Sequence, residues 1–319
     1  MKKSWFAAAL AVLFLFSLSG CAGSSSAAEE DGKLHILATT YPVYLFTTAL
    51  TGGMEEVEVT RLINGEVSCL HDYTLSVNDM KAIEKADVIV MNGAGLEDFM
   101  SDALDRSDAA VINCSEGIAL LPAQGHEGHG HEEEESGHYD PHIWMDPDRA
   151  VQMLENIRAG LAAVVPNLAE ALQTNTDAAL ELLDPGRQGL AGPSLCALAT
   201  NHSSLRALCT DLSFITFHDG FQYFAQAFDL DLLRSIEEEE GSEASAQEIK
   251  EIVSLIGEHR IPAIFTEVNG SDATARAISR ETGVAVRQLD MIMSGDGVGI
   301  QPYIDAICAD LQTIAEALG

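Results

Sequence analysis

Short apolar segments rich in β-branched residues alternate with segments of helical periodicity along most of this 319-residue chain. Asp87–Met91 (DVIVM), for example, follows the helical segment Asn78–Ala86 and is typical of a parallel strand buried on both faces. Because neighbouring parallel strands need a crossover helix between them, this order predicts an α/β fold with parallel sheets covered by helices. The other expected strands are 34–38, 57–63, 109–113, 214–217, 230–236, 263–267 and 284–289, and the expected helices include 44–50, 96–104 and 273–282.

In the middle of the chain a polar segment and a long helical stretch interrupt the alternation of strands and helices, which resumes after them. The polar segment 125–138, called the His/Glu segment below, is too low in complexity to be packed. A long helical stretch follows it and is broken once, at Pro166. About 285 folded residues also exceed a typical single domain. We therefore expect an N-terminal α/β lobe at 33–166, a linking helix at 167–186 and a C-terminal α/β lobe at 187–319.

The N-terminus has the features of an export signal. Two lysines precede the apolar run Phe6–Phe16, which is too short to cross a bilayer because a crossing needs about 20 residues. Residues 18–21 (LSGC) resemble a bacterial lipobox, in which the cysteine is lipidated and becomes the first mature residue. We expect a signal peptide at 1–20, a lipid on Cys21 and a polar tether at 21–32; the alternative is an ordinary signal peptide cleaved next to that cysteine.

The charge balance limits the possible partners. The chain has 17 Lys and Arg residues against 50 Asp and Glu residues, and loss of Lys2 and Lys3 with the signal peptide leaves 15 against 50, a net charge of −35. Nucleic acids and anionic membrane surfaces both favour basic patches, so neither is expected as a partner. A cationic ligand is compatible with this charge. No second apolar run of 18 residues follows the N-terminal one, so we expect no transmembrane helix in the mature chain.

Four residues far apart in the sequence are candidate metal ligands: His71 in CLHDYTLS, His142 in YDPHIWMDP, His218 in TFHDGFQYFA and Asp290 in RQLDMIMSG. Three imidazoles and a carboxylate suit a tetrahedral Zn²⁺ ion. The gaps between the four are 71, 76 and 72 residues, so only a large fold can bring them together. His71, His218 and Asp290 follow expected strands, and ligands bind at the carboxyl ends of parallel strands. With two ligands in each half, the metal would lie between the lobes.

The His/Glu segment is a second candidate for metal binding. Its histidines and four consecutive glutamates could bind several zinc ions loosely, because ordering a flexible segment costs entropy on each capture. The alternative is a polar loop with incidental metal affinity. The histidines concerned are His126, His129, His131 and His138.

The cysteines give less information. Five remain besides Cys21, an odd number, and the sequence does not determine any disulfide pairing. Cys114 and Cys308 lie in apolar segments and are expected to be core thiols. Cys69 lies two residues before His71, so a thiolate ligand is conceivable beside a simple packing role. His259 has no supporting context and is expected to be an ordinary surface histidine.

Several sequence blocks, in this order, carry a resemblance to a known family. They are HDYTLSVNDMKAIEKADVIVMNGAGLEDFM, DPHIWMDP, HDGFQYFA, AIFTEVNGSDATARAISRETGVAV and LDMIMSG. With them the chain resembles the solute-binding lipoproteins of zinc and manganese ABC transporters, the metal-binding group of periplasmic binding proteins. The resemblance implies two lobes bridged by one long rigid helix, with one metal ion between them. Its ligand positions fall on His71, His142, His218 and Asp290.

The resemblance also implies a function. The protein would be a monomeric, non-enzymatic carrier, lipid-anchored outside the cytoplasmic membrane or in the periplasm, that passes Zn²⁺ to a membrane permease and its ATPase. Zinc-type members often carry a His-rich segment, and manganese-type members have a glutamate where His218 stands. Cys69-Leu70 before the first ligand and Met291 after the last depart from the family pattern, which has prolines there.

Other functions remain open from the residues alone. One is a manganese- or iron-binding homologue, and another is a metal-dependent surface adhesin. A third is a secreted zinc hydrolase, in which an acid such as Glu267 would act as the base beside a metal-bound water.

Overall fold

The computed structural model describes residues 32–65, 70, 73–123, 139–183, 212–237 and 245–319. Residues Leu34–Gly319 form one compact unit. The expected signal peptide, Cys21 and most of the tether lie outside the described residues.

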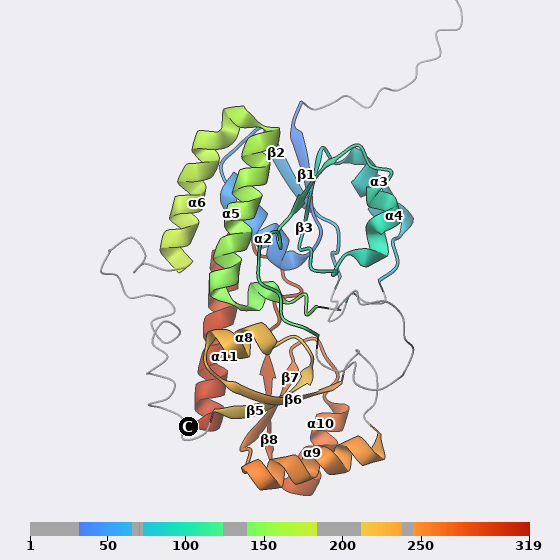
Figure 1. The fold of residues 1–319 in the computed structure, drawn as a ribbon, viewed down its shortest axis with the longest axis vertical. Coiled ribbons are helices and arrows are strands. Elements are labelled where there is room, and N and C mark those ends of the chain that lie inside the picture. Colours follow the sequence, from blue (N-terminus) through green and yellow to red (C-terminus); the bar gives the residue numbers. More distant parts are fainter. Residues whose placement is uncertain (1–31, 66–69, 71–72, 124–138, 184–211, 238–244) are drawn as a thin grey trace, which may run out of the picture. The chain divides into compact units, whose positions relative to one another are not determined.

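The first half of the compact unit contains one parallel sheet (Figure 1). Its strand order is β2-β1-β3-β4, and every neighbouring pair is parallel; Ile36, for example, lies opposite both Val59 and Val88. All residues of β3 but the last are fully buried, as expected of a strand covered on both faces. The elements are β1 (Leu34–Ala38), α2 (Tyr41–Thr51), β2 (Val57–Arg61), α3 (Val77–Lys85), β3 (Val88–Met91), η1 (Asp98–Met100), α4 (Ser101–Leu104) and β4 (Ala110–Asn113).

The second half contains another parallel sheet, whose strand order β6-β5-β7-β8 repeats that of the first. All its neighbouring pairs are also parallel, which confirms the expected two-lobe α/β fold with helix-covered parallel sheets. The elements are β5 (Ser213–His218), α8 (Gln222–Ala227), β6 (Asp231–Glu237), α9 (Ala246–His259), β7 (Ala263–Glu267), α10 (Ala273–Thr282), β8 (Ala285–Leu289) and α11 (Gln301–Leu318).

The strand order creates one switch point in each sheet. The chain moves from β1 to one neighbour, β2, and later to the other, β3, and it does the same around β5. Loops at the carboxyl ends of such central strands diverge and leave room for a ligand. The carboxyl end of β5 is His218 itself, so this residue ends the strand, whereas the sequence pattern placed it just after.

Two boundaries differ from the expected ones for local reasons. Helix α2 begins three residues before the expected Tyr44, because Pro42 fits the first turn, where its missing N–H is not needed. The segment expected as one helix at 96–104 is divided into η1 and α4, and Gly95 before it has a φ of +87°. That glycine-rich turn delays the start of regular helix.

The helical stretch in the middle of the chain consists of α5 (Pro147–Val164), a 3₁₀ turn η3 (Pro166–Leu168) and α6 (Ala169–Leu183). The break lies at Pro166, as the sequence predicted. Helix α6 packs against α5 and α2, and Figure 1 shows α5 and α6 side by side. Residues 184–211 lie outside the described part, so the linking helix 167–186 and the lobe boundaries stay predictions.

The apolar core is divided by the second sheet. One large cluster joins the first sheet, α2, α5 and α11 with one face of β5, including Phe214. A smaller cluster under α9 takes the other face of the same strand, through Ile215 and Phe217. Successive side chains of a strand point to opposite faces, so this alternation lets one strand serve both clusters. The carboxyl end of β5 is therefore held on both faces.

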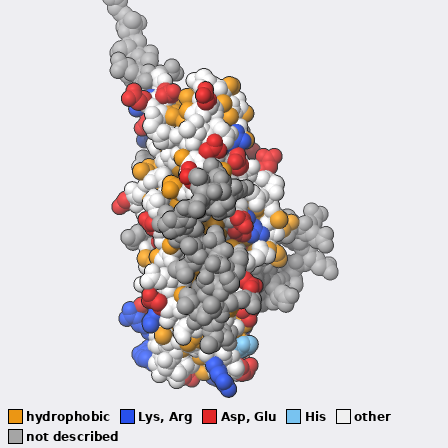
Figure 2. Space-filling view, turned by 90° about the vertical axis from the view of Figure 1, so that its left-hand side faces the viewer, with side chains coloured by type: hydrophobic (Ala, Val, Ile, Leu, Met, Phe, Trp, Pro, Cys, Tyr) orange, Lys and Arg blue, Asp and Glu red, His pale blue; other side chains and the backbone are white. Residues whose placement is uncertain are grey.

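The surface fits the strongly acidic composition. On the face in Figure 2, Asp and Glu side chains are spread among other residues and do not form a single patch. No helix in the described part of the chain is both long and apolar enough to cross a membrane. Cys114 is fully buried, as expected, and burial raises the pKa of its thiol well above the ordinary value, so it is an inert core thiol. Cys308 is half-buried in α11.

Candidate metal centre

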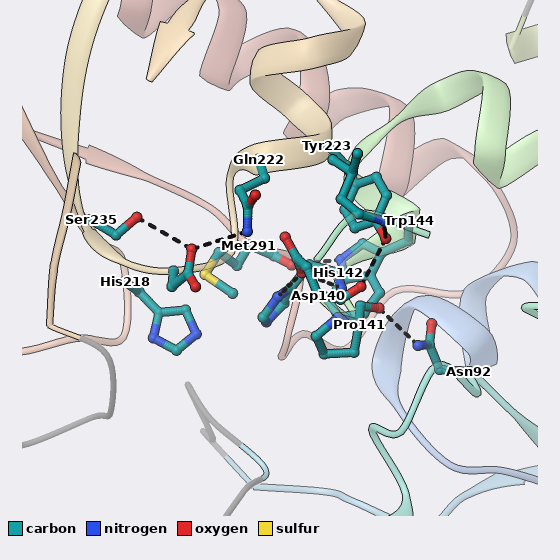
Figure 3. A network of polar contacts seen from close by, with 12 residues as sticks. Asn92, Asp140, Pro141, His142, Trp144, His218, Gln222, Tyr223, Ser235 and Met291 are labelled. Atoms are coloured by element: carbon teal, nitrogen blue, oxygen red, sulfur yellow. Dashed lines mark hydrogen bonds and ion pairs between the residues drawn. The ribbon is translucent and has the colours of Figure 1, made fainter. Parts of the chain in front are cut away.

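His142 is a buried histidine held by a neighbouring carboxylate. Its side chain lies at the start of the 3₁₀ turn η2 (Ile143–Met145) and the residue is 3% exposed. Asp140 Oδ1 accepts hydrogen bonds from the backbone N–H of His142, at 2.9 Å, and from its Nδ1, at 2.8 Å (Figure 3). A carboxylate can only accept, so Nδ1 carries the proton and Nε2 carries the lone pair. The ring is thus oriented and in the tautomer that binds a metal through Nε2.

Three hydrogen bonds fix the chain on both sides of His142. The side-chain amide of Asn92, which follows β3, donates to Pro141 O at 2.9 Å. The hydroxyl of Tyr223, from α8, donates to Asp140 O at 2.8 Å. Two residues after the histidine, Trp144 Nε1 donates to Met291 O at 2.9 Å. The turn that carries His142 therefore contacts the carboxyl end of the first sheet and two segments of the second half.

His218 lies next to His142. It is 4% exposed at the end of β5, and the two imidazole rings have their centres 5.4 Å apart at an angle of 88°. Two imidazoles on one tetrahedral zinc ion, with Zn–N bonds of roughly 2.0–2.1 Å, would have ring centres about 5 Å apart. The observed spacing therefore fits a shared ion. The chain packs tightly here, because a Cβ added at Gly220 would lie 2.5 Å from Cε of Met291 and 3.2 Å from Cδ2 of His218.

Asp290 is not gathered with the two histidines. It follows β8, and its Oδ1 accepts a hydrogen bond from Ile292 N at 2.7 Å, while its own N–H donates to Asp310 Oδ1 at 2.9 Å. Burial raises the pKa of Asp290. Ile292 has a φ of +60°, which is strained for a β-branched residue. Among the described residues, no three His, Cys, Asp or Glu side chains form a group that could hold a metal ion.

The structure thus brings together two of the four predicted ligands, His142 and His218. His71 lies outside the described residues, as does Cys69. The four histidines of the His/Glu segment, His126, His129, His131 and His138, also lie outside them. Their roles stay predictions.

Sequence reasoning missed a buried carboxylate near this site. Glu97 is 2% exposed, and its two oxygens accept hydrogen bonds from the Thr39 hydroxyl at 2.6 Å and from the backbone N–H groups of Asn92 at 2.7 Å and Gly93 at 2.9 Å. Burial outweighs these bonds and raises the pKa of Glu97 to about 7. Glu97 thereby fixes the loop that presents Asn92 to Pro141. The glycine-rich run NGAG, followed by an acidic pair flanked by apolar residues (LEDF), is the sequence signal for such a loop.

Replacing Glu97 with glutamine is expected to change how the stability of the metal-free protein depends on pH. The pKa of Glu97 is higher in the folded chain than the ordinary 4.5, so the folded state holds this proton more tightly than the unfolded chain does. Its contribution to stability is therefore greatest below about pH 4.5 and falls as the pH rises towards 7. Between pH 5 and pH 7 the fall amounts to about 2 kcal/mol. Glutamine does not titrate, so the Glu97→Gln variant should not show this fall in stability.

Urea unfolding of both proteins at pH 5 and pH 7, with a chelator present, measures this difference. The wild type should lose about 2 kcal/mol more than Glu97→Gln between the two pH values. The same substitution at Glu281, an exposed residue of α10, is the matched control and should behave as the wild type does. Equal pH dependence in wild type and Glu97→Gln would contradict the assignment.

Three comparisons relate the chain to known proteins. A model of the family described as zinc-uptake complex component A, periplasmic, matches residues 36–317. The zinc-binding lipoprotein AdcA of Streptococcus pneumoniae is 29% identical over 326 residues, which cover 99% of this chain and 61% of that protein. The manganese-binding lipoprotein MntA of Halalkalibacterium halodurans is 25% identical over 323 residues, which cover 100% of this chain and 99% of that protein.

The fold is also similar to that of a solved zinc-bound domain. The Zn(II)-bound ZnuA-like domain of Streptococcus pneumoniae AdcA superimposes with a TM-score of 0.70 and is 26% identical; the match covers 90% of this chain and 99% of that domain. The chain spans about three fifths of the full-length AdcA protein, since it covers 61% of that sequence. Because the family model extends over nearly all of the folded residues, this chain belongs to the zinc-uptake complex component A family of periplasmic solute-binding transport proteins.

Proposed function

We propose that this protein is the extracytoplasmic zinc-binding component of an ABC importer. It would capture Zn²⁺ with His142 and His218 and pass it to a membrane permease driven by an ATPase. The observation that carries the proposal is the pair of buried imidazoles 5.4 Å apart, one of them oriented by a buried carboxylate. A zinc-binding relative of 29% identity and the family membership support it.

The remaining ligands of the site belong to the proposal as well. His71 would supply a third imidazole, and Asp290 would supply the carboxylate of a four-coordinate ion. The His/Glu segment would add weak zinc sites through His126, His129, His131 and His138. A lipid on Cys21 would anchor the protein outside the membrane, in keeping with relatives named as lipoproteins.

The donor set favours zinc over manganese. Imidazole nitrogens suit Zn²⁺, whereas Mn²⁺ prefers carboxylate and other oxygen donors. A manganese-binding relative matches this chain over its whole length, so manganese is the main alternative cargo. The two residues that the structure brings together are both histidines, and this favours zinc.

The burial of the pair favours carriage over catalysis. A catalytic zinc site keeps a coordination position open to water or substrate. His142 and His218 are only 3% and 4% exposed, so protein would surround an ion held between them. The zinc hydrolase alternative is therefore disfavoured, and no enzymatic activity is proposed.

Metal titration of the purified protein without residues 1–20 tests the proposed function. Elemental analysis after dialysis, followed by competition with a zinc indicator of known affinity, should give one tightly bound Zn²⁺ per chain. The same measurement with Mn²⁺ should give weaker binding, as expected for imidazole ligands. Absence of any zinc site tighter than about micromolar would overturn the proposal.

Deleting residues 125–137 is expected to remove weak zinc equivalents and leave one tight site. The segment is rich in His and Glu, but it would have to be ordered on each capture, so its affinity should be low. Isothermal titration of zinc into the deletion variant and the full chain measures both stoichiometry and affinity. If the deletion abolished the tight site, the segment would have to be part of it.

A further inference from the structure

The Tyr223 side chain joins the two parts of the protein that carry the histidine pair. It lies in α8, which begins four residues after His218, and it is fully buried. Its hydroxyl donates to Asp140 O at 2.8 Å and accepts from Leu121 N at 2.9 Å. Asp140 is the residue whose carboxylate binds the His142 imidazole. One hydroxyl therefore connects the element after His218 to the residue that orients His142 (Figure 3).

The two segments that bond to the Tyr223 hydroxyl also bond to each other. Asp140 N donates back to Leu121 O at 2.9 Å, and the adjoining residues Pro122 and Tyr139 form an antiparallel β-bridge. The hydroxyl thus bridges the two chain segments at the point where they pair. Removing it leaves a buried N–H and a buried C=O without this partner, and that loss is costly inside a protein. Burial also raises the pKa of Tyr223 to about 12, so the hydroxyl keeps the proton that it donates.

The ring of Tyr223 is fixed as firmly as its hydroxyl. The guanidinium carbon of Arg149, from α5, lies 4.7 Å from the ring centre. Arg149 also donates to Gln226 Oε1 at 2.9 Å, one turn along α8, and to Ala119 O at 3.3 Å. A further ion pair joins Arg149 to Asp146 at the start of α5. Helix α8 therefore has little freedom to move relative to the turn that carries His142.

We propose that Tyr223 is a positioning residue that sets the spacing between the two histidine ligands. The inference rests on the proposed function, because it assumes that His142 and His218 bind one metal ion. Tyr223 touches neither imidazole in any contact described above; it acts through Asp140 on one side and through α8 on the other. Metal sites depend on such outer partners, whose loss commonly weakens binding by roughly 10- to 100-fold. Tyr223 contacts Asp140 and not the proposed ligand itself, so its loss is expected to have a smaller effect.

The test is Tyr223→Phe, which removes only the hydroxyl. Zinc affinity should fall about 3- to 10-fold, mainly through faster dissociation in a chelator chase. The absorption bands of the Co²⁺-loaded protein should also shift, because they report ligand geometry, which a purely structural role would leave unchanged. Thr176→Val, which removes a buried hydroxyl from α6, is the control and should alter neither property.

A double variant tests the route through Asp140. In an Asp140→Ala background, Tyr223→Phe should lower zinc affinity less than it does in the wild type, because the carboxylate that Tyr223 positions through the Asp140 backbone is gone. Additive effects would overturn the proposal, and so would Tyr223→Phe with wild-type affinity and an unshifted Co²⁺ spectrum.

If circular dichroism shows that Tyr223→Phe does not fold, Arg149→Met serves instead. It should lower zinc affinity about 2- to 5-fold, and unchanged binding would count against the proposal. Failure of the wild type to bind zinc tightly would refute the proposed function itself.

Discussion

Replacing His142 or His218 with alanine is expected to lower the affinity for zinc by at least about 100-fold, because each change removes one of the few proposed direct metal ligands. Loss of an outer partner already costs roughly 10- to 100-fold, so loss of a ligand should cost more. The two imidazoles lie 5.4 Å apart, and the double variant should lose tight binding altogether. Competition titration against a zinc indicator measures the effect.

The control for this experiment is His259→Ala. His259 is an exposed residue in the last turn of α9, and its removal should leave zinc binding unchanged. Far-UV circular dichroism of the metal-free variants should match that of the metal-free wild type. Near wild-type zinc affinity in the double variant would remove both histidines from the site.

Replacing Asp140 with alanine is expected to weaken zinc binding by up to about 100-fold although Asp140 is not a proposed ligand. Its Oδ1 accepts from both the backbone N–H and Nδ1 of His142, so it fixes the orientation and tautomer of the ring. Without it the ring can rotate, and Nδ1 can carry the lone pair instead of Nε2. Asp140→Asn keeps an acceptor oxygen at the same place but loses the charge, so its zinc affinity should lie between those of the wild type and Asp140→Ala.

Zinc titration of the three proteins gives this order directly. The exposed Asp177 of α6 provides the matched control, and Asp177→Ala should bind zinc as the wild type does. An Asp140→Ala variant as tight as the wild type would mean that His142 is oriented by other contacts or is not a ligand.

Local signals in the sequence were sufficient for most of the secondary structure. Helix α10 begins and ends where its periodicity predicts, and it stops at Gly283, whose φ of +79° suits the left-handed residue that ends a helix. Strands β1 and β7 also have the expected bounds, because an apolar run between turn residues specifies a strand with few alternatives. These features depend only on residues a few positions apart.

The candidate ligands were predictable to a lesser degree. His142 and His218 stand in short motifs, and the family resemblance pointed to both as ligands. Asp290 was predicted as a ligand too, and that role stays a prediction: in the structure its Oδ1 accepts from Ile292 N, and no described group of three such side chains includes it. The sequence does not show whether a carboxylate forms such a bond to the backbone two residues on.

By itself the sequence determined the α/β class, most of the helices and strands, and the acidic charge, all of which follow from residue type and short-range periodicity. Its short motifs also gave the candidate histidine ligands. Only the tertiary structure decided which residues support the site. Tyr223 contacts Leu121 and Asp140 across 102 and 83 positions, and Glu97 is buried by contacts with a strand end 58 positions away. Such contacts depend on how the sheets and helices pack, and packing is a property of the whole fold that no local pattern encodes.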